Sequence, residues 1–246
     1  MSFERRLQSL IRNASDEPGV SSLVVFGSTT TDAQHRRDQY SDIDFNLFIT
    51  PDEAGESARS SWPFLPDPDA LVATAREGGD GGLALYDDGL VMEFGAGRPW
   101  GISDPDREVL VDGGDIVVSD PPAPPDPANQ IRVFLIKLLI GYGRTQRGEV
   151  VAGQVHLHNY ALSALADALR GRLAPDAPRN PYDPLRRLEQ SLPEVAEQLA
   201  RLQREQPHAC ALGLLDLAEE RLAPGWDDFP TEAFAVARRA LDQPSA

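Results

Sequence analysis

The chain has 246 residues, of which 41% are hydrophobic and 25% charged. This composition is typical of globular proteins and excludes disordered, collagen-like and disulfide-rich chains, while the length allows one sizeable domain or two small ones. A formal net charge of -16 disfavours nucleic acid and anionic membranes as partners and favours cationic or neutral small molecules.

The sequence predicts neither a membrane span nor export. Its longest apolar run, Val133 to Tyr142, is interrupted by Lys137 and has about half of the roughly 20 residues that a spanning helix needs. The first residues lack the basic start and apolar run of a secretory signal. The lone cysteine, Cys210, permits no internal disulfide. We therefore expect a cytoplasmic protein.

The first half of the chain has the pattern of a mixed α and β domain. Helical spacing of apolar residues predicts a helix over 3–13, and an apolar run predicts a buried strand over 23–26. Residues 42–50 alternate polar and apolar, as a half-buried strand does. The turn signal Asp87-Asp88-Gly89 predicts a hairpin of strands 83–86 and 90–94, and a weaker pair is expected at 108–111 and 116–118.

The second half is predicted to be helical. Residues 119–129 are rich in proline, which favours a stiff connector without helix or central strand. Five helices are expected after it, at 130–146, 151–172, 184–206, 209–222 and 231–241. The predicted fold class is therefore α+β, with a mixed sheet flanked by helices in a domain over 1–125 and a helical bundle over 126–246.

The most informative motif joins the two main strands. The strand at 23–26 ends in Gly27-Ser28, where a missing side chain lets phosphate oxygens approach backbone N–H groups. Thirteen residues later, Asp42 and Asp44 lie two apart on a strand and therefore share one face. Two such carboxylates suit magnesium that also binds substrate phosphates.

A third acidic residue lies on the predicted hairpin. Glu93 stands in the otherwise apolar segment 90–94, where a carboxylate is costly unless it is paired or bound to a metal. Each feature has an ordinary alternative: a Gly-Ser turn, a solvated Asp-x-Asp strand, or an edge strand that exposes its glutamate. Their occurrence together and in this order favours a metal-nucleotide site.

These motifs resemble those of the polymerase-beta-like nucleotidyltransferases. The match consists of Phe26-Gly27-Ser28, then Ser41-Asp42-Ile43-Asp44-Phe45, and Glu93 on a later strand. A helical bundle after such a domain is similar to the branch of antibiotic adenylyltransferases that act on aminoglycosides and lincosamides. The resemblance implies ATP as the donor of AMP to an acceptor hydroxyl, and two magnesium ions held by Asp42 and Asp44. It also implies that Glu93 either completes the metal shell or accepts the proton of the acceptor hydroxyl as the base.

The predicted bundle adds further candidates. Lys137, the only lysine, and Arg144 lie seven residues apart on one stripe of an apolar helix, and are expected to reach the triphosphate. The alternative is that both mark the water-facing edge of that helix. Glu149 is a rival to Glu93 as the base, since some relatives use a glutamate of the bundle.

The expected activity is magnesium-dependent transfer of AMP from ATP to a hydroxyl of a small molecule. A second interpretation is a nucleotidyltransferase that modifies a protein partner, as in the antitoxin branch. A third is a nucleotide-binding module without catalysis, against which the presence of Asp42, Asp44 and Glu93 argues.

Overall fold

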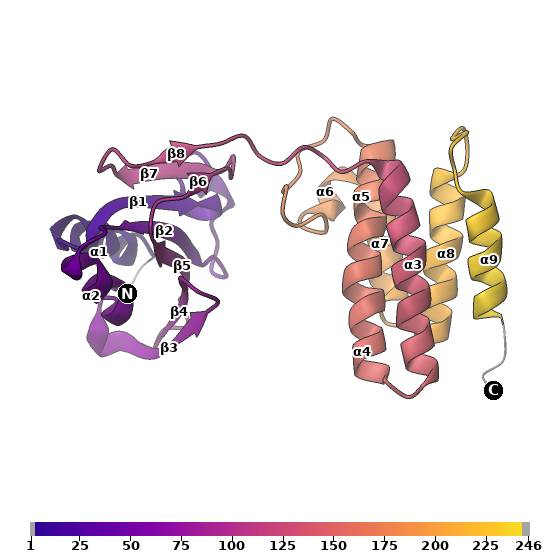
Figure 1. Cartoon of the computed structure of the whole chain (residues 1–246), viewed down its shortest axis with the longest axis horizontal. Coiled ribbons are helices and arrows are strands. Elements are labelled where there is room, and N and C mark those ends of the chain that lie inside the picture. The colour runs from indigo at the N-terminus through magenta and orange to yellow at the C-terminus, as the bar shows by residue number, and fades with distance from the viewer. Residues whose placement is uncertain (1–2, 243–246) are drawn as a thin grey trace. The chain divides into compact units, whose positions relative to one another are not determined.

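The computed structural model describes residues 3–242. The chain divides into two compact units, Met1–Pro121 and Pro122–Ala246. A mixed sheet with two covering helices forms the first unit, and helices form the second (Figure 1). The predicted α+β class is thereby confirmed.

The sheet of the first unit has six strands in the order β3-β4-β5-β2-β1-β7. Its strands are β1 (Val20–Phe26), β2 (Ile43–Ile49), β3 (Leu71–Glu77), β4 (Gly81–Tyr86), β5 (Val91–Gly97) and β7 (Arg107–Val111). β2 and β5 are parallel, and the other neighbours are antiparallel. Two short parallel strands, β6 (Gly101–Ile102) and β8 (Val117–Val118), make a separate small sheet.

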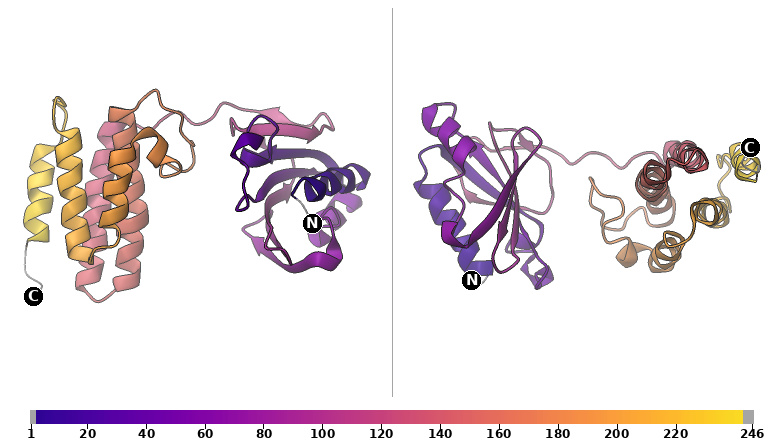
Figure 2. Two further views of the ribbon diagram at one scale, coloured as in Figure 1. Left: turned by 180° about the vertical axis from the view of Figure 1, so that it is seen from behind. Right: turned by 90° about the horizontal axis from the view of Figure 1, so that it is seen from below.

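The two faces of the six-stranded sheet have different surroundings. Helices α1 (Phe3–Asp16) and α2 (Glu53–Ser61) lie on one face (Figures 1 and 2), where residues such as Leu10, Leu23 and Phe45 form the main core. On the other face a smaller cluster contains Phe48 and Ile102. The polar residues of β2 therefore point away from the helices, because neighbours along a strand alternate between faces.

The strands at 23–26 and 42–50 and the hairpin are confirmed. The turn closes through a Tyr86 N–H that donates to the Leu90 carbonyl at 3.0 Å, and Gly89 supplies the positive φ of 84°. The predicted pairing of 108–111 with 116–118 is wrong, because β7 pairs with β1 and β8 with β6. The Asp115 carboxylate, which accepts from the Ser21 and Ser22 hydroxyls, anchors this segment across β1.

The second unit contains a long apolar helix, α3 (Pro127–Gln146), and the helices that pack around it. These are α4 (Val150–Val155), the π-helical η4 (His156–Ala161), α5 (Leu162–Leu173), α6 (Leu188–Ser191), α7 (Pro193–Leu202), α8 (Pro207–Leu222) and α9 (Thr231–Leu241). Within residues 3–242 no helix combines the length and apolarity that crossing a membrane would require.

Two predictions for this half are corrected. The predicted helix 184–206 is wrong in extent, because the segment forms only α6 and α7, and Pro193 begins the second of them. The proline-rich connector is shorter than expected at its end. Pro127 occupies the first turn of α3, where proline loses no hydrogen bond, and the Asp126 carboxylate caps the helix by accepting from Ala128 and Asn129 N–H.

Candidate active site

Two carboxylates stand at the start of β2. Asp44 belongs to the strand and Asp42 directly precedes it, and both residues are half-buried. Residues two apart on a strand point to the same side. The face that they share is the one opposite α1 and α2, because Ile43 and Phe45 between and after them lie in the helix-facing core.

Glu93 lies directly beside this pair. β5 runs parallel to β2 with Asp44 opposite Glu93 in the register, so both side chains leave the same face of the sheet. The expectation that burial makes this charge costly is wrong, because Glu93 is exposed even though β5 is an interior strand. The face of β5 opposite the helices is open to solvent at this position.

The Gly27-Ser28 turn ends the neighbouring strand. β1 pairs antiparallel with β2, with Val25 opposite Phe45, so Gly27 follows β1 near the beginning of β2. Gly27 has a φ of +56°, and a Cβ built on it would have no atom within 4 Å. The Gly27 N–H donates to the Asp106 carbonyl at 2.8 Å, so the phosphate donors predicted at this turn are the N–H groups that follow it.

The helical turn η1 (Gly27–Thr29) begins at the same glycine. The first N–H groups of a helical turn have no partner within it, and of the two that follow Gly27, Ser28 is half-buried and Thr29 is buried. Phosphate binding at Gly27 and Ser28 stays a prediction.

Arg37 holds this turn in place, and sequence reasoning missed it. Its guanidinium donates to the Ser28 carbonyl at 3.1 and 3.0 Å and to the Thr29 carbonyl at 3.2 Å. It also lies 4.2 Å from the centroid of the Phe3 ring. Nothing in the sequence distinguishes Arg37 from Arg36, which forms an ion pair with Asp106 at 2.7 Å. The loop that contains η2 (Gln34–Arg36) therefore fixes the conformation of the turn.

The acidic side chains of this site can supply only some of the ligands of a magnesium ion. Within the described residues, no group of three histidine, cysteine, aspartate or glutamate side chains is arranged to hold a metal ion. Asp42 and Asp44 nevertheless supply two hard oxygen ligands on one face, and magnesium is commonly bound by one or two carboxylates together with substrate phosphates. The site is therefore suited to a metal that arrives with a nucleotide.

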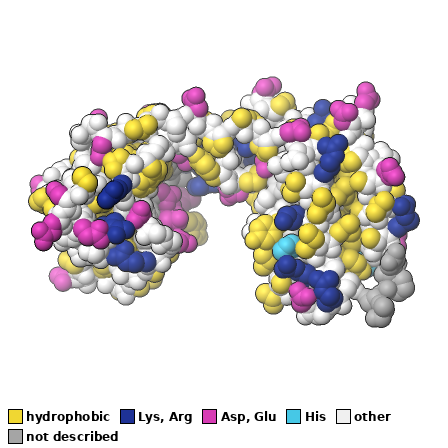
Figure 3. All heavy atoms as spheres, in the orientation of Figure 1, with side chains coloured by type: hydrophobic (Ala, Val, Ile, Leu, Met, Phe, Trp, Pro, Cys, Tyr) yellow, Lys and Arg dark blue, Asp and Glu magenta, His cyan; other side chains and the backbone are white. Residues whose placement is uncertain are grey.

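The candidates of the bundle belong to the second unit. Lys137 and Arg144 are half-buried on α3, and neither forms an ion pair with the described residues. The Lys137 Nζ atom lies 5.5 Å from the Tyr160 ring centroid. On the face of the bundle turned to the viewer, Figure 3 shows basic side chains among hydrophobic ones. Contact of Lys137 and Arg144 with the triphosphate stays a prediction.

Glu149 also lies in the second unit, at the exposed beginning of α4, where its carboxylate accepts from Arg147 Nε at 3.1 Å.

Two other polar residues of the bundle have internal partners. Asp167 lies 3.8 Å from Arg179, and its burial raises the pKa of its carboxyl. His158 Nε2 lies 3.6 Å from Cys210 Sγ, and burial lowers the pKa of this imidazole.

Similarity to known proteins is found among solved structures. No family model and no curated protein matches the chain. Among solved structures, it is similar to an aminoglycoside 6-adenyltransferase from Bacillus subtilis, with 11% sequence identity and a TM-score of 0.37 over 99% of this chain and 100% of that one. A similarity this low carries no conclusion about activity, which has to rest on the residues of the chain itself.

Proposed function

We propose that the protein is a magnesium-dependent nucleotidyltransferase that moves AMP from ATP to a hydroxyl of a small molecule. One observation carries the proposal. Asp42 and Asp44 share a face of β2, the register places Glu93 beside Asp44, and the Gly27-Ser28 turn ends the strand on the other side of β2. This combination joins metal ligands with a place for phosphate.

The Gly27-Ser28 turn and the two aspartates would each bind part of the triphosphate. The empty space at Gly27 would let a phosphate oxygen come close to the backbone, where the N–H group of the half-buried Ser28 would donate. Asp42 and Asp44 would hold magnesium, which when bound neutralises phosphate charge and aligns the attacking and leaving oxygens.

Glu93 is the proposed base. The acceptor oxygen forms a bond to the α-phosphorus, the bond from that phosphorus to the bridging oxygen breaks, and pyrophosphate leaves with the bond electrons. The proton of the acceptor hydroxyl passes to the Glu93 carboxylate. Glu93 is exposed and stands next to Asp44, so an acceptor from solution can reach it without a change in the sheet.

The acceptor is proposed to be a hydroxylated small molecule such as an aminoglycoside or a lincosamide. The net charge of -16 favours a cationic acceptor over nucleic acid. The same class is favoured by the helices that follow the first unit, because a helical bundle after such motifs is similar to the antibiotic adenylyltransferase branch.

The test is incubation of the protein with ATP labelled in the α-phosphate, magnesium, and separate panels of aminoglycosides, lincosamides and candidate proteins. Transfer of label to a small molecule, with one pyrophosphate released per label, would support the proposal. Transfer to a protein alone would refute the small-molecule acceptor. Failure of the protein to bind magnesium-ATP would refute the nucleotidyltransferase assignment itself.

A further inference from the structure

Beyond the three acidic residues, the same face of the sheet carries an asparagine and a tryptophan around a glycine. Asn46 and Gly95 are opposite each other in the register of β2 and β5. A Cβ built on Gly95 would lie 2.7 Å from Asn46 Oδ1 and 3.2 Å from the Cη2 atom of Trp100. The Asn46 amide and the indole ring therefore both lie directly over Gly95, where a side chain would displace them.

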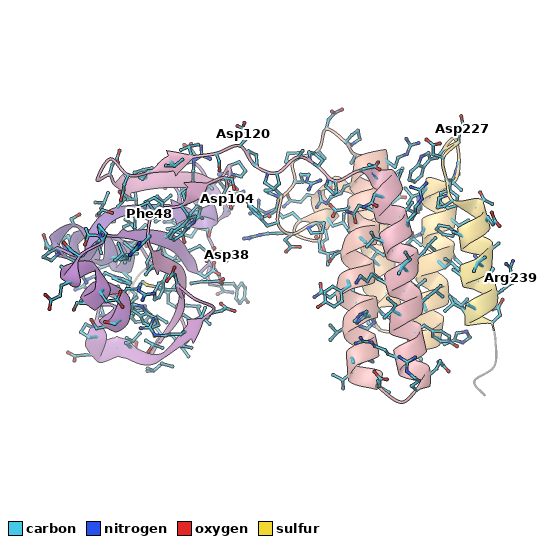
Figure 4. All side chains as sticks on the ribbon, in the orientation of Figure 1. Asp38, Phe48, Asp104, Asp120, Asp227 and Arg239 are labelled. Atoms are coloured by element: carbon cyan, nitrogen blue, oxygen red, sulfur yellow. The ribbon has the colours of Figure 1, made fainter. Side chains whose placement is uncertain are left out.

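The ring of Trp100 packs against the small apolar cluster that contains Phe48 and Ile102. It makes an edge contact with Phe48, labelled in Figure 4, with 5.0 Å between ring centroids. Phe48 is fully buried, and Trp100 is half-exposed. The indole is thus supported on one side and open to solvent on another.

The polar side-chain atoms of Asn46 and Trp100 make no hydrogen bond within the described part of the chain. Neither the Asn46 amide nor the Trp100 Nε1–H has a hydrogen-bond partner among residues 3–242, although both residues are half-buried. Polar groups that are partly withdrawn from water usually find partners. An amide that both donates and accepts, next to an aromatic ring and above a glycine, is a suitable place for a planar group with a hydrogen-bonding edge.

The position of the group relative to the acidic residues suggests which planar group it takes. Asn46 follows Asp44 by two residues on the same face, which is about 7 Å along a strand. The Gly27-Ser28 turn lies toward the other end, next to the start of β2. In the proposed reaction the phosphates bind at the turn and the acceptor binds next to Glu93. The nucleoside of the donor then lies on the side of Asn46.

We infer that Asn46, Gly95 and Trp100 form the subsite for the purine base of the nucleotide, an inference that rests on the proposed function. The Asn46 amide pairs with the hydrogen-bonding edge of the base, as asparagine does with adenine elsewhere. Trp100 contacts the ring of the base, and Gly95, which has no side chain, lets Asn46 and the indole lie over the sheet. Nucleotide selectivity then depends on these residues, whereas binding of the triphosphate does not.

The experiment compares two probes, magnesium-ATP and magnesium-ribose 5-triphosphate, which lacks the base. Binding of each is measured by calorimetry to the wild type, Asn46→Leu and Gly95→Ala. We expect both variants to bind ATP about tenfold more weakly, the lower range of a base contact, and to bind the ribose triphosphate as the wild type does. Gly101→Ala is the matched control, because its new Cβ would meet only the Ser119 side chain, at 3.2 Å.

Unchanged ATP affinity in Asn46→Leu, or equal weakening for both probes, would overturn the subsite. Asn46→Leu keeps the size of the side chain, so a folding failure of Gly95→Ala does not remove the test. If the wild type transfers AMP but the variants keep full ATP affinity, only the subsite is refuted. If the wild type binds neither probe, the proposed function fails first.

Discussion

Replacing Gly27 by alanine separates the strain in the turn from the role of the turn in binding. Gly27 has a φ of +56°, where a residue with a Cβ is strained by about 1 kcal/mol or somewhat more. The new methyl would meet no atom of the described chain within 4 Å, so no steric clash adds to the strain. We therefore expect Gly27→Ala to fold, with a free energy of unfolding lower by about 1 kcal/mol.

The effect on the nucleotide should be larger than the effect on the fold. In the proposed site the methyl occupies the space where a phosphate oxygen comes close to the backbone. We expect the affinity for magnesium-ATP to fall by at least about tenfold, which is about 1.4 kcal/mol. Calorimetric titration with ATP gives the affinity, and thermal unfolding gives the stability.

Gly114→Ala provides the matched control. Gly114 has a φ of +81° and similarly empty space around a built Cβ, but it lies after β7, beyond the end of β1 opposite to Gly27. It should lose similar stability and keep its ATP affinity. If both variants bind ATP like the wild type, or both lose affinity equally, the assignment of the Gly27 turn to phosphate binding is refuted.

Three other predictions concern the base, the lysine and the acceptor. Glu93→Gln should bind magnesium-ATP nearly normally but transfer AMP at least roughly 100-fold more slowly, the low end for loss of a general base; if Glu149→Gln is the stalled variant instead, the base lies in the second unit. Lys137→Ala should weaken ATP binding, with Lys137→Arg restoring it only in part because a guanidinium fork does not replace a point charge, and unchanged calorimetric affinity would count against this contact. A cationic acceptor should show a KM that rises steeply with salt, since charges are screened over about 10 Å at 0.1 M, whereas a salt-independent KM would indicate a neutral acceptor.

The strands that carry the acidic residues were predictable because their signals are local. The apolar run at 23–26, the alternation after Asp42 and the Asp87-Asp88-Gly89 turn each specify a strand or turn within a few residues. The i and i+2 spacing of Asp42 and Asp44 fixes their common face in the same way. The register that puts Glu93 opposite Asp44 is not local, and only the structure shows it.

Other parts of the first unit depend on contacts between distant segments. α2 and β3 were not predicted, because α2 is rich in serine and β3 is exposed along most of its length, so neither has a clear apolar pattern. The hydrogen bonds from Arg37 to the Ser28 carbonyl depend on how an irregular loop folds. The convergence of Asn46 and Trp100 over Gly95 depends on strand register and on the path after β5.

A turnover assay of Asp42→Asn and Asp44→Asn decides whether these two aspartates bind the metal of a nucleotidyl transfer. Both residues are half-buried at the start of β2 and asparagine keeps the size of the side chain, so either substitution should leave the fold intact. Asp69→Asn is the control, because Asp69 is exposed and lies in η3 (Pro68–Ala70), away from β2 in sequence. We predict unchanged thermal unfolding in all three variants, wild-type AMP transfer in Asp69→Asn, and no detectable transfer in the other two. Near-normal turnover in either Asp42→Asn or Asp44→Asn would contradict the account.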